Sequence, residues 1–296
     1  MDPHQSIVDR IAESGGVVVL VGGIDSGKTT LGRSIAAAGV RSGRSVAFLD
    51  ADLGQKTVGP PACVGLRMVR DEHDLDAGEG LQPDDLSFVG STSPQGQLLP
   101  LVVGTGLLQA RAQELGADLV VVDTSGLVSG VYGQILKFHK IELLRPDVVI
   151  GLARGEELDP LLGIVRRFFP TDVVTLQVHP DVGSTSVEER AKRREEAMRA
   201  YFGESQQRWK VKPTVFMPAL PALFDHAKLD HLLVGMSDGQ GRTSGIGFLE
   251  HSADDGVLRL ISPVADAPTA LKLGSVRLDP DFRIRRVDLR NLFGTD

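Results

Sequence analysis

Nine consecutive residues near the start of the chain have the types and spacing of a phosphate-binding loop. The segment Gly22-Gly23-Ile24-Asp25-Ser26-Gly27-Lys28-Thr29-Thr30 fits the pattern G-x-x-x-x-G-K-[ST] and follows the apolar run at 17–21. In such a loop the backbone N–H groups point at the β-phosphate, the lysine reaches the β- and γ-oxygens, and the following hydroxyl binds Mg²⁺. A glycine-rich turn built only for packing is the alternative. Lys28 and Thr29 favour a site for a nucleoside triphosphate and its metal.

Two carboxylates follow the second apolar run, at 45–50. Asp50 and Asp52 stand where that run ends, and the carboxyl ends of parallel strands form the ligand-binding edge of an open α/β sheet. One carboxylate on Mg²⁺ or its waters and one that accepts a proton from an attacking hydroxyl are the minimum acidic set of a kinase. The chain leaving the sheet would redirect Asp52 toward the substrate, which leaves Asp50 for the metal. A capping or turn role is the alternative for either side chain.

A third carboxylate, Asp123, ends the apolar run at 118–123 and precedes Thr124-Ser125-Gly126. Four apolar residues followed by Asp match the Walker B pattern, in which the carboxylate holds the magnesium shell. The turn after it would lie beside the γ-phosphate. An ATPase or GTPase would use the same turn to sense that phosphate, so this segment does not separate a nucleotide switch from a kinase.

Two arginines and a hydroxyl-rich segment complete the set. Arg190 and Arg194 lie one turn apart on a predicted helix. On a mobile helix, two guanidinium groups would neutralise charge on the transferring phosphoryl group, as arginine fingers do, whereas a solvated helix face is the alternative. The segment 91–94, Ser-Thr-Ser-Pro, precedes another predicted helix and by itself predicts a cap for that helix.

The elements that must hold these residues alternate between strand and helix over the first 200 residues, the pattern of a parallel sheet wrapped by helices. We predict strands at 17–21, 45–50, 86–90, 118–123, 147–152 and 172–178, and helices at 28–42, 96–115, 131–145, 157–169 and 186–202. Short β-like runs follow at 214–217, 245–250, 257–261, 274–278 and 284–287, and the acidic segment 71–85 is predicted to be an exposed loop. The predicted fold class is α/β: a three-layer P-loop NTPase core with a mostly parallel sheet at 1–204, plus a small β-rich region at 205–296.

Composition narrows the class of protein. The chain has 296 residues, 42% of them hydrophobic, and its single cysteine, Cys63, allows neither an internal disulfide nor a zinc cluster. Its apolar runs are short, so we expect a cytoplasmic protein that does not bind membranes. The net charge of −7 argues against coating of long nucleic acids, although the basic clusters at 166–167, 190–194, 208–212 and 283–286 are compatible with a local groove.

Together, these motifs resemble one known family. FLDADLGQ at 48–55 followed by Pro60-Pro61, the element at 92–94, DTSG-x₃-G at 123–130, and Arg-x₃-Arg before Tyr201-Phe202-Gly203 are similar to the P-loop polynucleotide 5′-hydroxyl kinases. That family includes the RNA kinase associated with the tRNA-splicing endonuclease and the kinase of ribosomal RNA processing. The resemblance covers 17–203 and is weaker in the C-terminal region.

The resemblance implies roles for individual residues. Residues 22–30 would hold ATP and Mg²⁺, and Asp52 would be the base for the 5′-hydroxyl. Gln55 would orient metal-bound water or substrate, and Arg190 and Arg194 would form a lid. Thr124 and Gly126 would approach the terminal nucleotide of the partner, a 5′-hydroxyl end of RNA or DNA, most simply single-stranded.

Two residues depart from the family pattern. Leu127 stands where the family usually has a tryptophan that stacks on the terminal base, and loss of such a platform removes roughly 1–3 kcal/mol per base. Weaker or less selective binding of the terminal base is therefore expected. Asp123 stands where family members often have asparagine, which predicts a tighter magnesium shell or an additional hydrolytic capability.

The leading hypothesis is an ATP-dependent kinase that transfers the γ-phosphoryl group to the 5′-hydroxyl of RNA or DNA by in-line displacement. The alternative is an ATPase or GTPase switch that serves as a regulatory binding module. Guanine selectivity is not supported, because the run at 147–152 leads into Gly151-Leu152-Ala153-Arg154-Gly155 rather than an Asn-Lys-x-Asp element. A small-molecule kinase is a third reading, but it would give no reason for a basic groove.

Overall fold

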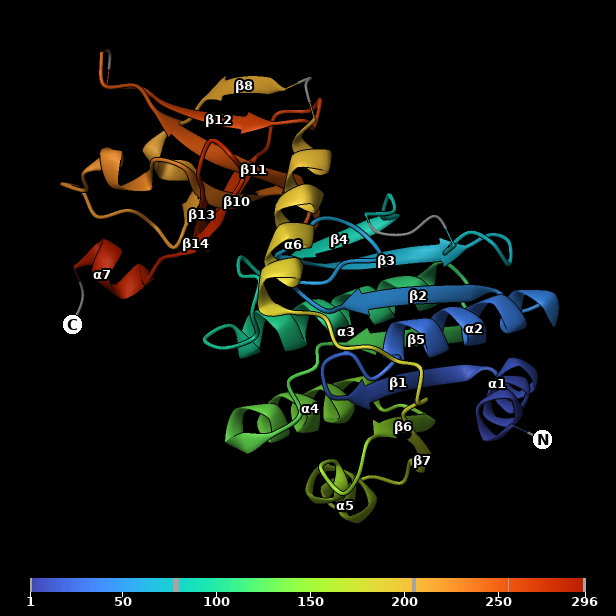
Figure 1. Cartoon of the computed structure of the whole chain (residues 1–296). Helices are drawn as coiled ribbons and strands as arrows, with labels where there is room; N and C mark the ends of the chain where they lie inside the picture. The colour runs from blue at the N-terminus through green and yellow to red at the C-terminus, as the bar shows by residue number, and fades with distance from the viewer. Residues whose placement is uncertain (1, 77–79, 204–205, 255, 295–296) are drawn as a thin grey trace.

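Runs of Val, Leu and Ile build a central sheet that is buried on both faces, as in a parallel sheet covered by helices. The structure, a computed structural model, describes residues 2–76, 80–203, 206–254 and 256–294. The strand order of the first sheet is β4-β3-β2-β5-β1-β6-β7 (Figure 1). Its strands are β1 (Gly16–Gly22), β2 (Val46–Ala51), β3 (Cys63–Val69), β4 (Asp85–Phe88), β5 (Leu119–Thr124), β6 (Val148–Ala153) and β7 (Asp172–Gln177).

The sheet is parallel from β2 through β5, β1 and β6 to β7, and β3 and β4 add antiparallel at one edge. The carboxyl ends of β1, β2 and β5 therefore meet at one edge of the sheet, below the start of α6 (Figure 1). The helices are α1 (Pro3–Ser14), α2 (Lys28–Arg41), α3 (Leu98–Glu114), α4 (Gly130–Leu144), α5 (Asp159–Phe168), α6 (Val187–Phe202) and α7 (Leu289–Phe293).

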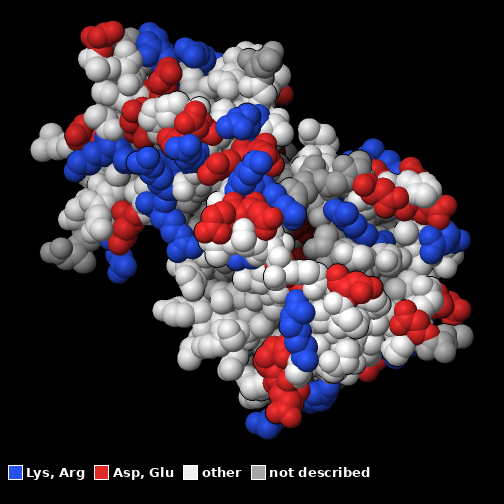
Figure 2. Space-filling model, viewed as in Figure 1, with Lys and Arg blue, Asp and Glu red and all other residues white. Residues whose placement is uncertain are grey.

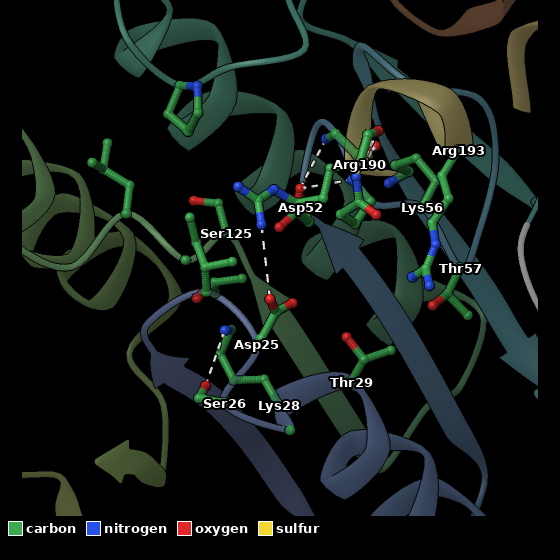
Figure 3. A pocket seen from close by; sticks show the side chains of 18 of the residues that line it. Asp25, Ser26, Lys28, Thr29, Asp52, Lys56, Thr57, Ser125, Arg190 and Arg193 are labelled. Atoms are coloured by element: carbon green, nitrogen blue, oxygen red, sulfur yellow. Dashed lines mark hydrogen bonds and ion pairs between the residues drawn. The ribbon is translucent and has the colours of Figure 1, made fainter. Parts of the chain in front are cut away.

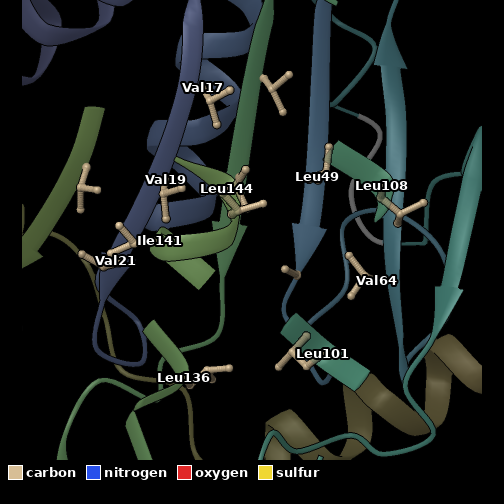
Figure 4. Packing of buried hydrophobic residues seen from close by; sticks show 14 of the residues in the cluster. Val17, Val19, Val21, Leu49, Val64, Leu101, Leu108, Leu136, Ile141 and Leu144 are labelled. Carbon is tan, nitrogen blue, oxygen red and sulfur yellow. The ribbon is translucent and has the colours of Figure 1, made fainter. Parts of the chain in front are cut away.

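Alternate side chains of β1 enter two different cores, because successive residues of a strand point to opposite faces. Val17, Val19 and Val21 pack with α3, α4 and α5 (Figure 4). Val18 and Leu20 pack with α1 and α2 on the other face. The result is the three-layer core that the sequence predicts.

A second sheet follows α6, with the order β14-β13-β10-β11-β12-β8 and the short strand β9 beside β13. Its strands are β8 (Gln207–Lys210), β9 (Phe216–Met217), β10 (Leu232–Ser237), β11 (Thr243–His251), β12 (Leu258–Ser262), β13 (Ala270–Leu278) and β14 (Ile284–Arg286), with 3₁₀ turns at Pro213–Val215 and His226–Leu229. One face of this sheet packs on Phe88 of β4 and on Met198 and Phe202 of α6. Helix α6 thus links the two sheets (Figure 1).

The predicted class, α/β with a mostly parallel sheet and a β-rich C-terminal part, is confirmed. The sequence reading missed α1, β3, β8 and β10, and the strand predicted at 214–217 is a 3₁₀ turn followed by only two strand residues. The domain boundary predicted between 204 and 205 lies outside the described residues, as do positions 77–79 of the predicted loop. No helix in the described part of the chain combines the length and apolarity needed to cross a membrane.

Candidate active site

A cavity of about 620 Å³ lies at the carboxyl edge of the first sheet. The side chains of Asp25, Ser26 and Lys28 lie on one side of it, and those of Asp52 and Arg190 lie on the other (Figure 3). Further walls come from 54–57, 92–95, 124–127 and from Arg193 and Arg194 of α6. The topology thus brings together segments that are far apart in the sequence.

Lys28 forms hydrogen bonds to other residues of the phosphate loop. The Lys28 Nζ donates to the Gly23 carbonyl at 2.6 Å and to the Ser26 hydroxyl at 3.2 Å. Burial lowers the pKa of Lys28, and the nearby Asp123 carboxylate opposes that shift. An ammonium that is partly stripped of water and held over the loop suits a phosphate-binding role, because it can exchange these neutral partners for an anion.

Two glycines shape the loop for its task. Gly27 has a φ of +84° and caps α2 without a side-chain bond, so the first N–H groups of the helix remain available to an anion. At Gly22 a Cβ would lie 2.5 Å from the Ser26 hydroxyl. Of the nine predicted cofactor-binding residues, 24–30 line the cavity, whereas Gly22, which ends β1, and Gly23 do not.

Thr29 and Asp123 meet as the two halves of a metal site. The Thr29 hydroxyl donates to Asp123 Oδ2 at 2.5 Å, while Asp123 Oδ1 is buried with no hydrogen-bond partner in the described part of the chain. Burial raises the pKa of Asp123 to about 6, against the opposing effect of Lys28. An orphaned carboxylate oxygen beside a threonine hydroxyl fits Mg²⁺, which prefers oxygen ligands. No group of three His, Cys, Asp or Glu side chains among the described residues is placed to hold a metal unaided, so phosphate oxygens would complete the shell.

The prediction that Asp50 binds the metal is wrong. Its Oδ1 pairs with Lys56 Nζ at 3.0 Å, and its Oδ2 accepts from the backbone N–H groups of Thr57 and Val58 at 2.6 and 3.0 Å. The side chain is 1% exposed and does not line the cavity. Asp50 therefore stabilises the loop after β2. Its oxygens are already bonded to Lys56, Thr57 and Val58 and are not available to a metal.

Asp52, by contrast, lines the cavity with a free oxygen. Its Oδ1 accepts from the N–H groups of Gly54 and Gln55 at 2.8 and 3.1 Å, which fixes the orientation of the carboxylate. No described residue donates a hydrogen bond to Oδ2. Gln55, also in the wall, donates weakly from its side chain to the Arg190 carbonyl at 3.3 Å and so connects this turn to α6. The carboxylate is oriented and open to a ligand.

The turn after β5 differs in part from expectation. The Thr124 hydroxyl is fully buried; it donates to the Leu20 carbonyl at 2.7 Å and accepts from Lys137 Nζ at 2.8 Å. That hydroxyl is therefore held by the protein, while Thr124 itself is among the residues that line the cavity. Gly126 lines the cavity and allows a close approach, since a Cβ there would lie 2.7 Å from the Ile24 backbone nitrogen.

Leu127 lines the cavity and also packs against the core. No aromatic side chain is among the described residues of the cavity wall. The missing tryptophan is therefore not replaced by another ring within the described wall.

Two buried lysines beneath the site were not recognised from the sequence. Lys137 and Lys140 belong to the buried face of α4, and both are fully buried. Lys137 donates to Thr124 and, at 2.7 Å, to the Ser125 carbonyl, while Lys140 Nζ has no hydrogen-bond partner within the described ranges. Burial lowers the pKa of Lys137 well below its usual range and that of Lys140 to about 7. Their spacing within the apolar stripe of the helix was the available signal.

Helix α6 directs its arginines into the cavity. A capping box between Ser186 and Glu189 starts the helix, and Asp25 of the phosphate loop accepts from the Thr185 N–H at 2.6 Å. Arg190 lies 3.8 Å from Asp25, with only 19% of its side chain exposed, and Arg194 lines the same wall. These arginines do not belong to a solvated face, unlike Lys192 and Glu196, which pair on the outside of the helix at 3.7 Å.

The hydroxyl-rich segment before α3 does not cap that helix. Helix α3 begins at Leu98 after Gln97, which makes no side-chain cap bond. Thr92, Ser93 and Pro94 line the cavity instead. They face the same space as Asp52 and so form part of the wall beyond the phosphate loop.

Comparisons with known proteins agree with this geometry. A family model described as the mRNA cleavage and polyadenylation factor CLP1 P-loop matches residues 22–204. The polyribonucleotide 5′-hydroxyl-kinase of Methanocaldococcus jannaschii is 37% identical over 193 residues, which cover 64% of this chain and only 51% of that protein. The polyribonucleotide 5′-hydroxyl-kinase of Pyrococcus horikoshii is 28% identical over 319 residues, covering 89% and 86%. The solved structure of the wild-type Clp1p–Pcf11p complex superposes with a TM-score of 0.66 at 17% identity, over 93% of this chain and 77% of that one, and shows the same fold.

Proposed function

The chain belongs to the CLP1 P-loop family, and from that premise we propose that it is an ATP-dependent polynucleotide 5′-hydroxyl kinase. One observation carries the proposal: Asp52 presents an oriented carboxylate with an open oxygen in the cavity that the phosphate loop also lines. A site for hydrolysis alone has no need of a second wall formed by 92–95 and 126–127. A kinase needs that wall for its acceptor.

The donor half would bind ATP through the loop at 24–30. Its backbone N–H groups and Lys28 would hold the phosphates, and the start of α2 would add the positive end of its dipole. Thr29 and Asp123 would hold Mg²⁺, which when bound neutralises charge on the β- and γ-phosphate oxygens. Asp123 must be ionised for this role.

The acceptor half would position the 5′-hydroxyl against Asp52. As the 5′-oxygen forms its bond to the γ-phosphorus, the bond from that phosphorus to the bridging oxygen of ADP breaks, and the hydroxyl proton passes to Asp52 Oδ2. The hydrogen bonds from Gly54 and Gln55 hold Oδ1, so the second oxygen is fixed in orientation. Positioning would supply much of the rate.

Arg190 and Arg194 would approach the transferring phosphoryl group from α6 and stabilise its charge. The contact between Asp25 and Thr185 ties the start of α6 to the phosphate loop. Occupation of that loop would therefore affect how the arginines are presented.

We further propose that the acceptor is single-stranded RNA. Two relatives that align with the chain are named polyribonucleotide 5′-hydroxyl-kinases. The division into a kinase domain at 1–204 and a β-rich region at 205–296 is likewise proposed, and a cytoplasmic location stays a prediction from the sequence.

The proposal is tested by transfer of label from the γ-position of ATP to a 5′-hydroxyl RNA decamer. The same RNA bearing a 5′-phosphate is the matched control, and a 5′-hydroxyl DNA decamer tests the preference for RNA. Label should enter only the 5′-hydroxyl acceptors, with faster transfer to RNA. Release of phosphate without transfer to any acceptor would contradict the kinase assignment and favour a nucleotide switch.

A further inference from the structure

We propose that Arg286, on the edge strand β14 of the C-terminal sheet, binds the phosphodiester backbone of the acceptor strand beyond its first nucleotide. This inference rests on the proposed function. The inference extends the acceptor site to the C-terminal sheet. The residues that line the cavity do not include any residue of that sheet. Arg190 and Arg194 line the cavity, and Arg286 would add a third arginine outside it.

Strand register puts Arg286 on the side of the sheet that faces α6. Ile284 lies opposite Leu278, and Arg286 lies opposite Val276. Directly opposed residues of an antiparallel pair point to the same face. Leu278 and Val276 both pack in the cluster that contains Met198 of α6. Arg286 therefore shares the face that is turned toward that helix.

The same helix face carries Arg194. Arg194 and Met198 are four residues apart and lie on one side of α6. Burial and Arg190 lower the pKa of the Arg194 guanidinium, Asp52 and Glu195 oppose the shift, and Arg286 adds a smaller lowering effect. Arg286 therefore lies within electrostatic range of Arg194.

Contacts between the two sheets hold β14 beside the cavity. Next to Arg286, the Val287 N–H donates to the Ser275 carbonyl at 2.8 Å. The Ser275 N–H donates to the Gly90 carbonyl at 2.7 Å, and the Gln97 side chain donates to the Ser275 hydroxyl at 3.3 Å. Gly90 and Gln97 bracket the cavity wall at 92–95. The strand is thus anchored at the mouth of the acceptor half.

Arg194 also reaches the acceptor side directly. A Cβ built on Gly54 would lie 3.2 Å from the Thr92 carbonyl, 3.6 Å from Arg194 Cδ and 3.7 Å from Asp52 Oδ1. The stem of Arg194 therefore passes beside the carboxylate that we propose as the base. A strand whose 5′-end lies at Asp52 can leave along Arg194 toward Arg286.

The positive charges of Arg194 and Arg286 favour binding of an anion between them. No acidic side chain in the described part of the chain forms an ion pair with Arg286, which is exposed at the sheet edge. Two neighbouring guanidinium groups repel each other unless an anion lies between them. Figure 2 shows a band of basic side chains across the C-terminal sheet beside α6, on a protein with a net charge of −7. A phosphodiester backbone supplies anions at the required regular spacing.

The test compares Arg286→Gln with Arg285→Gln. Arg285 is the next residue on the same strand, points to the opposite face, and is 77% exposed with a weak contact to Asp279 at 4.0 Å. Both variants lose one positive charge, and neither change disturbs a core. Two readouts are used: the anisotropy of a 3′-labelled 5′-hydroxyl RNA decamer with a non-hydrolysable ATP analogue, and kcat/KM for acceptors of different length.

We expect Arg286→Gln to weaken binding of the decamer roughly tenfold. The slope of log affinity against log salt concentration should become shallower by about 0.7, the value for one lost phosphate contact on a single strand. A nucleoside 3′-monophosphate, which has no phosphate beyond its first nucleotide, should be phosphorylated by Arg286→Gln at the wild-type rate. Arg285→Gln should match the wild type, and Arg286→Lys should recover part of the loss.

Equal binding of the decamer by wild type, Arg286→Gln and Arg285→Gln would overturn the inference. So would an equal loss on the decamer and on the nucleoside 3′-monophosphate, because Arg286 would then act on the chemistry through Arg194. Failure of the kinase assignment has a different signature, since the wild type would then transfer no label to any acceptor. The binding arm still tests Arg286 in that case.

Discussion

Lys137 donates a hydrogen bond of 2.8 Å to the hydroxyl of Thr124, and the same Nζ donates to the Ser125 carbonyl at 2.7 Å. The lysine is fully buried in α4, and the turn that it holds forms the cavity wall between the phosphate loop and Leu127. An amino group under this turn fixes its backbone from below. The acceptor wall is therefore held by buried hydrogen bonds rather than by apolar packing alone.

Replacing Lys137 should affect binding of the acceptor more than binding of ATP. In Lys137→Met the Ser125 carbonyl loses a buried donor, so the turn at 124–127 becomes less ordered. We expect kcat/KM for a 5′-hydroxyl RNA to fall about tenfold or more, with the Kd for ATP within about twofold of wild type. Lys140→Met is the matched control, because it removes a buried lysine that makes no hydrogen bond, and it should leave kcat/KM for the RNA near the wild-type value. An equal loss of ATP affinity in Lys137→Met would contradict a role limited to the acceptor wall.

Lys140 makes stability depend on pH. Burial lowers its pKa from 10.5 to about 7, so between these values the unfolded chain binds a proton that the folded protein does not. The free energy of unfolding should therefore rise with pH over this window, by about 1 kcal/mol per pH unit, because the cost of burying this lysine is greatest near pH 7 and below and disappears as pH approaches 10.5. Urea unfolding at pH 7 and pH 9 measures this slope. Lys140→Met should be more stable than wild type at pH 7, and a difference between the two proteins that is the same at both pH values would rule out this origin.

Asp50 should matter for folding rather than for the metal. Asp50→Asn leaves Lys56 buried without its counter-ion, which costs about 3–5 kcal/mol of unfolding free energy. The double variant Asp50→Asn with Lys56→Met should recover part of this loss, because it removes the unpaired charge. Chemical denaturation of Asp50→Asn, Lys56→Met and the double variant measures the coupling. A fully stable Asp50→Asn with weakened Mg²⁺ dependence would restore Asp50 to the metal site.

Protonation of Asp123 should weaken Mg²⁺ binding at low pH. Its pKa is raised by burial to about 6, so below that pH the proton competes with Mg²⁺ for the same carboxylate. The apparent Kd for Mg²⁺, measured from Mg²⁺ titrations of ATP-dependent turnover, should rise about tenfold per pH unit below 6 and be nearly constant above 7. Asp123→Asn should lose this pH dependence. A Kd for Mg²⁺ that does not change between pH 5 and pH 7 would mean that another group controls the metal.

Structural features that depend on residues close together in the sequence were predictable. The phosphate loop, its strand and its helix follow from a contiguous motif, and the pairing of Thr29 with Asp123 follows from two motifs at neighbouring strand ends. The placement of Arg190 and Arg194 on one face of a helix follows from their spacing. These features need no knowledge of distant contacts.

Other features depend on tertiary contacts and were missed. Strand β3 contains Gly65 and Arg67 within a short apolar run, and its pairing with β2 supplies the order that its own sequence does not. Asp50 and Asp52 have the same type and nearly the same position, and only the burial of Lys56 beside Asp50 separates their roles. The role of Lys137 likewise depends on tertiary contacts, because its partners Thr124 and Ser125 lie at the end of β5.

The central claim is that Asp52 is the base in a two-substrate site, and Asp52→Asn tests it most directly. Transfer from γ-labelled ATP to a 5′-hydroxyl RNA decamer is measured under single-turnover conditions, with ATP binding measured on the same samples. The amide has the same shape but accepts no proton, so transfer should fall by about 10²–10⁴-fold while the Kd for ATP stays within about twofold of wild type. Wild-type transfer by Asp52→Asn would contradict the account, because the proton would then leave by another group.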